Sequence, residues 1–178
     1  MKEYKTRKQI RLKEYDYSLN GYYFITMCSY NRENIFGEIP VGADGCRPDN
    51  NTKIILNEYG LIVEEELKNT ENIRQEIKLD RYAIMPNHVH CIIIIQRQLS
   101  GGQPAAPTGQ TLSSFVSGFK SVATKRINIL RDTSAKPVWQ RSFYDHIIRN
   151  DRSLNAIREY ISNNPFNWEQ DIDNLINL

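Results

Sequence analysis

The sequence is poor in cysteine and has no long apolar run, and both shortages narrow what the protein can be. The three cysteines, Cys28, Cys46 and Cys91, are an odd number at wide spacings and include no Cys-x-x-Cys pair. They therefore indicate neither a disulfide framework nor a cysteine zinc site, which favours a reducing compartment. No apolar stretch approaches the roughly 20 residues that span a bilayer, and the first residues are charged. We therefore expect a soluble, cytoplasmic protein.

An excess of one charge is also missing, because 23 Lys and Arg stand against 21 Asp and Glu and give a net charge of +2. The basic residues are nevertheless grouped in two places, which include Arg7, Lys8 and Arg11 in the first group and Lys120, Lys125 and Arg126 in the second. Cations that follow phosphates, together with ten tyrosines that can stack on bases, favour a nucleic-acid partner. A solvated protein surface would give the same pattern.

Apolar periodicity predicts four strands and three helices in a chain of a length that suits one compact domain. The strands are expected at 22–30, 77–85, 88–95 and 137–148, and the helices at 56–67, 112–130 and 153–164. Thr111 is the expected N-cap of the second helix, and Pro165 ends the third. Residues 37–52 should form a loop or a short hairpin, and residues 100–109 a flexible connection.

This order of elements predicts an α+β fold of the ferredoxin-like or RRM-like type. The βαββαβ unit would form a mainly antiparallel four-stranded sheet with two helices on one face. The closing helix is then free to lie against the other face or an edge. Within one domain of residues 1–178, we assign 1–20 to a basic arm, 21–149 to the sheet with its two helices, and 150–178 to the closing helix and tail.

Histidine is as scarce as cysteine, yet two of the three histidines lie in one short motif, Met85-Pro86-Asn87-His88-Val89-His90. His88 and His90 are two residues apart on a predicted strand, so both side chains point to the same face, about 7 Å apart along the chain. Such a pair can bind one metal ion, and Cys91 points to the opposite face. The structural alternative is a pair of half-buried sheet histidines that are bonded to main-chain carbonyls.

A tyrosine and an asparagine on the closing helix suit the same site. Tyr160 and Asn164 are four residues apart, hence about 40° apart around a helix, and they border the apolar stripe of Leu154, Ile157 and Ile161. If this helix packs across the histidine strand, a phenol and an amide oxygen reach the imidazoles together. Two imidazoles and an amide carry no negative charge, so Mg²⁺ or Mn²⁺ should bind weakly until phosphate oxygens complete its shell. Metal binding is therefore expected to depend on DNA.

Three sequence blocks resemble a known family in their order and spacing. The run from Met85 to His90 is similar to the His-hydrophobic-His motif of HUH single-tyrosine transposases. The blocks 139–146 and 160–165 are similar to later blocks of the REP-associated tyrosine transposase branch, and the resemblance extends from the basic arm to Pro165. Beyond that point the sequence is Phe166-Asn167-Trp168-Glu169, where the branch usually has a Val-Lys-His-Gly-like stretch.

The resemblance implies a transposase-type endonuclease and strand transferase that acts on single-stranded, hairpin-associated DNA. Tyr160 is the implied nucleophile, which would leave a 5′-phosphotyrosine link and a free 3′-hydroxyl. His88, His90 and Asn164 are the implied ligands of Mg²⁺ or Mn²⁺, with Asn164 standing where related transposases outside this branch use glutamine. We expect a monomer whose closing helix folds back on its own sheet, whereas those related transposases exchange this helix between subunits.

Other residues leave alternatives open. Tyr144 shares a predicted strand face with His146 and is the competing nucleophile, although packing or base stacking is the commoner role for such a tyrosine, and His146 is a candidate DNA contact. A non-catalytic single-stranded nucleic-acid-binding module of the same fold would have the same basic groups without cleavage. A zinc hydrolase with His88, His90 and His146 is the third hypothesis. It is weakened because Asp145, the one carboxylate beside a histidine block, points away from His146.

Overall fold

The computed structural model describes residues 15–40, 54–97, 111–171 and 173. Its elements in chain order are β1 (Gly21–Cys28), the 3-10 turn η1 (Tyr30–Arg32), β2 (Gly37–Glu38), β3 (Ile55–Leu56), α1 (Glu58–Lys68), α2 (Thr70–Ile73), β4 (Ile77–Ile84), β5 (His88–Ile95), α3 (Leu112–Leu130), β6 (Tyr144–Ile148), α4 (Asp151–Asn163) and η2 (Trp168–Gln170). Within the described ranges, none of the helices is both long and apolar enough to cross a membrane. The predicted flexible connection at 100–109 lies outside these ranges.

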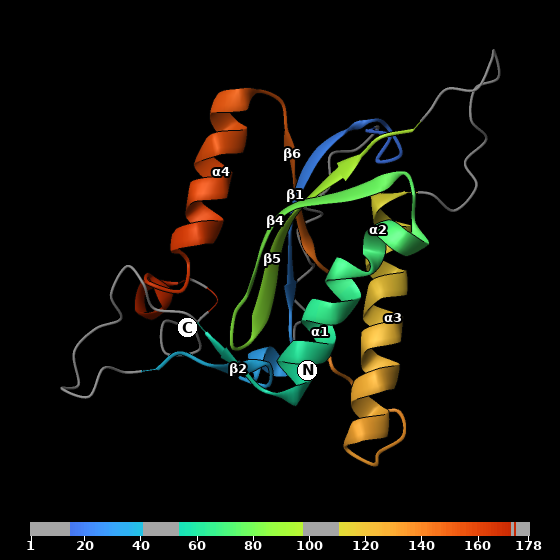
Figure 1. Ribbon diagram of the computed structural model, residues 1–178, viewed down its shortest axis with the longest axis vertical. Coiled ribbons are helices and arrows are strands. Elements are labelled where there is room, and N and C mark those ends of the chain that lie inside the picture. The colour runs from blue at the N-terminus through green and yellow to red at the C-terminus, as the bar shows by residue number, and fades with distance from the viewer. Residues whose placement is uncertain (1–14, 41–53, 98–110, 172, 174–178) are drawn as a thin grey trace, which may run out of the picture.

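The four long strands form one sheet in the order β4-β5-β1-β6, and every neighbouring pair is antiparallel. This is the strand order of a ferredoxin-like βαββαβ unit, so the predicted fold class is confirmed. Figure 1 shows α1 and α3 together on one side of the sheet and α4 alone on the other. The short strands β2 and β3 pair separately and give the segment predicted as a loop or hairpin a two-stranded base.

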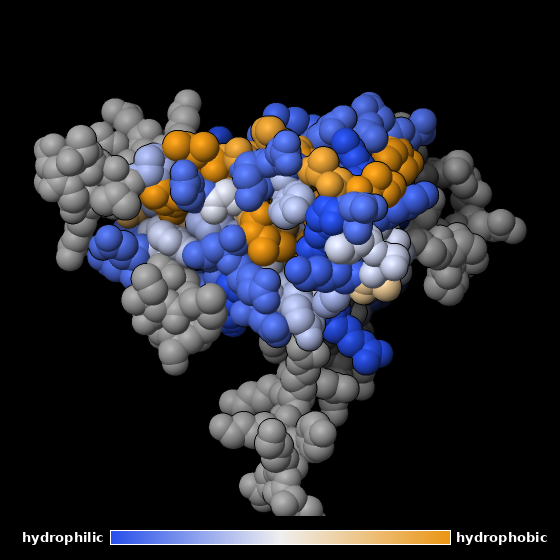
Figure 2. All heavy atoms as spheres, turned by 90° about the horizontal axis from the view of Figure 1, so that it is seen from below, coloured by the Kyte–Doolittle hydropathy of each residue, from blue (hydrophilic) through white to orange (hydrophobic). Residues whose placement is uncertain are grey.

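Alternation along the strands separates two apolar cores, one on each face of the sheet. The larger core lies between the sheet, α1 and α3, and it includes Cys91. The smaller core joins Ile92 of β5 to Ile161 of α4. Because successive strand residues point to opposite faces, His88 and His90 share the face of Ile92, which is the one that α4 covers. Seen from below in Figure 2, the outer surface carries apolar side chains in small groups between hydrophilic ones, which is ordinary for a protein surface.

The bounds of β1 and β6 depart most from those that the sequence predicts. β1 ends at Cys28, where the chain turns into η1, and β6 begins at Tyr144 although residues 137–143 look like its first half. Trp139 is 6% exposed and keeps only a single bridge to the end of β1. The Lys120 ammonium donates to two main-chain carbonyls of this irregular segment, each at 2.9 Å, and so holds it against α3. Residues 137–143 therefore look like a strand because Trp139 is buried, although their pairing is limited to this short contact with the end of β1.

The helix boundaries follow their caps. α3 has the predicted bounds, and Thr111 forms a capping box with Ser114. α4 begins two residues before the predicted start because Asn150 caps it, its side-chain oxygen accepting from the Ser153 N–H at 2.8 Å. α4 therefore keeps nearly the extent that the sequence predicts, and it carries Tyr160 in its last turn.

Candidate metal-binding and catalytic site

A tight turn between β4 and β5 brings the two histidines to the α4 face. The Met85 N–H donates to the His88 carbonyl at 2.8 Å and closes this turn around Pro86-Asn87. From there β5 directs His88 and His90 to the α4 face and Val89 to the larger core. The two imidazoles are 0% and 2% exposed. Such deep burial requires partners for their ring nitrogens.

The proton of His88 is placed by Asn87. The Asn87 amide nitrogen donates to the main-chain carbonyl of Arg32 at 3.1 Å and to that of Asp173 at 2.8 Å. Its oxygen is therefore the atom that lies 2.8 Å from His88 Nδ1. Because this oxygen can only accept, Nδ1 of His88 carries the proton. Nε2 of His88 then carries a lone pair, and this atom faces Nε2 of His90.

His90 has a partner that suits either of its tautomers. Its Nδ1 lies 2.8 Å from the hydroxyl of Thr26, which the register of β1 and β5 places opposite it. When Thr26 donates this bond, His90 Nε2 carries the proton and can donate to His88 Nε2 at 2.9 Å. When Thr26 accepts it, the lone pairs of both Nε2 atoms are available to one cation. A shift of the His90 proton from Nε2 to Nδ1, together with rotation of the Thr26 hydroxyl, thus frees both lone pairs.

Burial keeps both imidazoles neutral. Loss of solvation is the main reason why the pKa of His88 falls to about 3, with the Arg32 guanidinium adding to the effect and the Asn164 amide opposing it. The pKa of His90 is also lowered, mainly by loss of solvation and further by the neighbouring His88. Neutral imidazole is the form that binds a metal ion. The pair therefore needs no deprotonation before it can act as a ligand at pH 7.

Helix α4 places Tyr160 at the edge of this histidine pair. Arg158, two residues earlier, donates two hydrogen bonds of 2.8 and 2.5 Å to Asp80. Asp80 lies at the register shift within β4. Its bonds to Arg158 therefore tie α4 to one point along β4. The Tyr160 hydroxyl lies 3.3 Å from His90 Nε2, and its side chain is 45% exposed. The phenol is thus both close to the imidazoles and open to a substrate.

The protein alone does not activate this phenol. Loss of solvation raises the pKa of Tyr160 to about 12, and the carboxylates of Asp171 and Asp173 contribute to the rise, while the Asn164 amide opposes it. Tyr160 is therefore fully protonated at pH 7 and is a weak nucleophile until positive charge is brought close to its oxygen.

Asn164, the C-cap of α4, presents an oxygen to the same place. It is 2% exposed, and its Nδ2 donates to Asp171 Oδ2 at 2.7 Å. Its Oδ1 is buried and accepts no hydrogen bond from any of the described residues. The amide raises the pKa of His88, as an acceptor oxygen beside that ring does. Since a buried oxygen without a donor is costly, this atom suits a bound cation.

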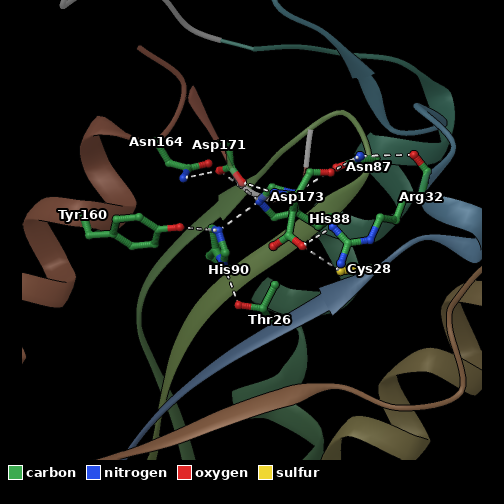
Figure 3. A network of polar contacts seen from close by, with 10 residues as sticks. All are labelled: Thr26, Cys28, Arg32, Asn87, His88, His90, Tyr160, Asn164, Asp171 and Asp173. Carbon is green, nitrogen blue, oxygen red and sulfur yellow. Dashed lines mark hydrogen bonds and ion pairs between the residues drawn. The ribbon is translucent and has the colours of Figure 1, made fainter. Parts of the chain in front are cut away.

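Two aspartates beyond α4, which no sequence pattern predicts as site residues, join the site. Asp173 is ion-paired with Arg32 at 2.6 Å and offers a carboxylate oxygen within 4.8 Å of ring nitrogens of His88 and His90. Asp171 is buried, with Oδ2 at 3.9 Å from His88 Nε2. Figure 3 shows both carboxylates beside the two histidines. Their only signal in the sequence is an Asp-x-Asp pair, a pattern that is common on protein surfaces.

The donor set fits a divalent cation. It offers two neutral imidazole nitrogens, an amide oxygen that no described residue binds and a carboxylate, a mixture of nitrogen and oxygen atoms that suits ions such as Mn²⁺ and Mg²⁺. The three predicted ligands, His88, His90 and Asn164, thus lie together with the predicted nucleophile, Tyr160.

Strand β6 places Tyr144 and His146 on the same sheet face but outside the histidine cluster. In the register with β1, Tyr144 is opposite Thr26 and His146 is opposite Phe24, and both side chains are exposed. The Phe24 ring centroid lies 6.2 Å from that of Tyr144 and 6.1 Å from that of Tyr160. Among the residues described, the one group suited to a metal joins the other two histidines to an aspartate, so the zinc site with His146 is not formed.

The basic residues of α3 lie on the other side of the sheet. The Lys120 ammonium is bound by two carbonyls, and loss of solvation lowers its pKa to about 8. Arg126 is bound at 2.6 Å by each of Glu65 and Glu66. Lys125 is carried by the same helix, so the structure does not bring these cations next to Tyr160. Their DNA contacts stay predictions, as do those of Arg7, Lys8 and Arg11, which lie outside the described residues.

Comparisons relate the chain to known proteins. A family model described as "Transposase IS200 like" matches residues 46–164. A protein of Haemophilus influenzae, called only an uncharacterized protein, is 38% identical over 176 residues, which cover 93% of this chain and 91% of that protein. The solved structure of a REP-associated tyrosine transposase bound to a REP hairpin covers 87% of this chain and 72% of that chain, with 18% identity and a TM-score of 0.57. At this identity the likeness of the two structures concerns the fold.

Proposed function

The chain belongs to the IS200-like transposase family, and from this premise we propose that it nicks and rejoins single-stranded DNA through a covalent bond to Tyr160. The observation that carries the proposal is the distance of 3.3 Å between the Tyr160 hydroxyl and His90 Nε2. The two groups come from elements that are distant in the sequence. Packing of the core does not require a half-exposed phenol to lie against a buried pair of imidazoles. A tyrosine that acts as a nucleophile beside a metal site must lie there.

In the proposed reaction the Tyr160 oxygen attacks a DNA phosphorus. The tyrosyl O–P bond forms and the bond from phosphorus to the 3′ oxygen of the preceding nucleotide breaks. That oxygen leaves as a 3′-hydroxyl, and the phenol proton passes to it or to water. The DNA remains attached as a 5′-phosphotyrosine. Because the ester is conserved, a 3′-hydroxyl can attack it in the reverse step and join two strands without ATP.

His88, His90 and Asn164 are the residues that we propose to hold Mg²⁺ or Mn²⁺. Such an ion, when bound, supplies positive charge beside the scissile phosphate, the phenol and the leaving oxygen. The chain supplies the orientation: Asn87 and Thr26 set the proton positions of the two imidazoles. The raised pKa of Tyr160 supports this proposal, since its phenol needs an added positive charge.

We propose that the DNA lies on the sheet face that carries α4, over the strands β1 and β6. Tyr144 is 43% exposed and stands edge-on to Phe24, which suits stacking on a base, and His146 lies beside it on the same edge strand. The REP hairpin in the similar solved structure supports hairpin-flanked single strands as the substrate class. Arg7, Lys8, Arg11, Lys120, Lys125 and Arg126 remain candidates for phosphate contacts. Because α4 packs on the sheet of its own chain, we propose a monomer as the active unit.

The proposal is tested with a labelled single-stranded oligonucleotide that contains a hairpin and both flanks. With Mg²⁺ or Mn²⁺ the protein should form an adduct that survives a denaturing gel. Tyr160→Phe should bind the DNA but form no adduct, and Tyr144→Phe, the matched control, should still form it. An adduct of undiminished yield in Tyr160→Phe would refute the assigned nucleophile. Salt-sensitive binding without cleavage in either metal would instead support the non-catalytic nucleic-acid-binding module.

A further inference from the structure

We propose that the tail after α4 supplies the metal site with a fourth ligand, the carboxylate of Asp173, so that the divalent cation binds before any DNA is present. The inference rests on the proposed function and extends its ligand set of His88, His90 and Asn164. The starting observation is that one carboxylate oxygen of Asp173 lies within 4.8 Å of ring nitrogens of both histidines.

Contacts from three directions hold Asp173 in this position. Arg32 binds Oδ1 at 2.6 Å, the Asn87 amide donates to the Asp173 carbonyl at 2.8 Å, and the Asp173 N–H donates to Asp171 Oδ1 at 2.7 Å. Arg32 and the residue before it, Asn31, have φ of 58° and 54°, a conformation that non-glycine residues adopt at a cost. That costly turn directs the guanidinium to Asp173. The hydrogen bonds and the ion pair from side chains of the described residues go to Oδ1, so the other oxygen of the carboxylate is available to a cation.

Asp171 acts on the same site as a positioning residue. Its Oδ2 accepts from Asn164 Nδ2 at 2.7 Å, so the amide must turn its oxygen the other way. That oxygen is buried and has no hydrogen-bond partner within the described residues. In the proposed site one aspartate of the tail thus presents the amide ligand and the second is a ligand itself; Figure 3 shows how the two side chains lie beside the histidines.

The carboxylate of Asp173 changes the charge of the metal site and with it the expected affinity for a divalent cation. Two imidazoles and one amide are neutral, so alone they would hold a hard cation only when phosphate oxygens are added. A carboxylate adds one negative charge and the type of oxygen that Mg²⁺ and Mn²⁺ prefer. Four protein ligands still leave positions open for a substrate oxygen. The tail therefore changes the expectation from DNA-dependent metal binding to metal binding by the free protein.

The test is a titration of the full-length, metal-free protein with Mn²⁺ in the absence of DNA, in which EPR measures the free ion. The wild type should bind one Mn²⁺, and Asp173→Asn should weaken binding by at least ~10-fold. Glu159→Gln removes an exposed carboxylate from α4 and should leave the affinity unchanged. Arg32→Gln removes the ion-pair partner, but the main-chain hydrogen bonds that join Asp173 to Asn87 and Asp171 remain and keep the carboxylate in place. With one positive charge fewer near the site, this variant should bind Mn²⁺ at least as tightly as the wild type. Circular dichroism establishes that each variant is folded.

The outcomes separate this inference from the proposed function. Wild-type affinity in Asp173→Asn, with binding abolished in His88→Ala, would refute the role of the tail and leave the histidine site in place. An equal loss in Arg32→Gln and Asp173→Asn would assign the effect to the ion pair and overturn the metal–carboxylate bond. Unchanged Mn²⁺ binding in His88→Ala would count against the proposed metal site as a whole.

Discussion

Replacing Thr26 by valine should weaken metal binding although Thr26 is not itself a ligand. Valine has the shape of threonine, so the substitution removes the hydroxyl that lies 2.8 Å from His90 Nδ1 and little else. Thr26 is 6% exposed, so water cannot readily replace its hydroxyl as the partner of His90. Without it, the tautomer with a free Nε2 leaves a buried Nδ1–H unbonded. Loss of such an orienting partner typically lowers metal affinity about 10- to 100-fold, or about 1.4 to 2.7 kcal/mol.

Thr26→Ser is the matched control because it keeps the hydroxyl and loses one methyl group. Its free energy of unfolding should fall by about 0.8 kcal/mol from lost burial, and that of Thr26→Val by about 1 kcal/mol from the lost hydrogen bond. The two variants should therefore unfold at similar urea concentrations but differ in Mn²⁺ affinity. Urea unfolding followed by circular dichroism and an Mn²⁺ titration measure the two quantities. If Thr26→Val bound Mn²⁺ as tightly as Thr26→Ser, the hydroxyl would not select the tautomer of His90, and this reasoning would be wrong.

Three further predictions concern the surroundings of the site. Asn87→Ala removes the three hydrogen bonds of a buried side chain, so urea unfolding should show a loss of about 3 kcal/mol, and Mn²⁺ affinity should fall as well; unchanged stability would contradict this. Burial lowers the pKa of His88 to about 3, below its unfolded value of about 6.5, so the unfolded chain binds more protons between these values. The metal-free protein should therefore lose about 1.4 kcal/mol per pH unit from this group as the pH falls from 6.5 towards 3, and urea unfolding of His88→Gln should show a shallower pH dependence. Arg158→Gln removes the ion pair between α4 and Asp80 and should slow adduct formation several-fold. Arg152→Gln, at an exposed position of the same helix, should not slow it. Equal rates in the two variants would show that the ion pair does not help to place Tyr160.

The sequence was sufficient for the elements whose burial has a clear period. The alternation from His88 to Ile95 predicts which face the imidazoles share, and the apolar stripe around Ile161 predicts a helix that carries Tyr160 and Asn164 beside that face. Both predictions depend on local geometry alone, and the structure confirms the helix and the strand.

Elements that depend on contacts distant in the sequence could not be predicted in the same way. The partnership of Thr26 with His90 follows from the register of β1 and β5, which the sequence does not state. Trp139 looks like a strand residue because it is buried. Its burial comes in part from contact with Phe119 of α3, a contact distant in the sequence that no local pattern predicts. Asp171 and Asp173 follow α4 without any period, and their place is set by Asn164, by Asn87 and by Arg32.

The central claim is that Tyr160 forms the covalent bond to DNA beside His88 and His90. The most direct measurement is proteolysis of the adduct formed with a single-stranded hairpin oligonucleotide and Mn²⁺, followed by mass spectrometry of the modified peptide. We expect the nucleotide mass on Tyr160 and none on Tyr144. A modified Tyr144, or a modified residue elsewhere with Tyr160 intact, would contradict the account.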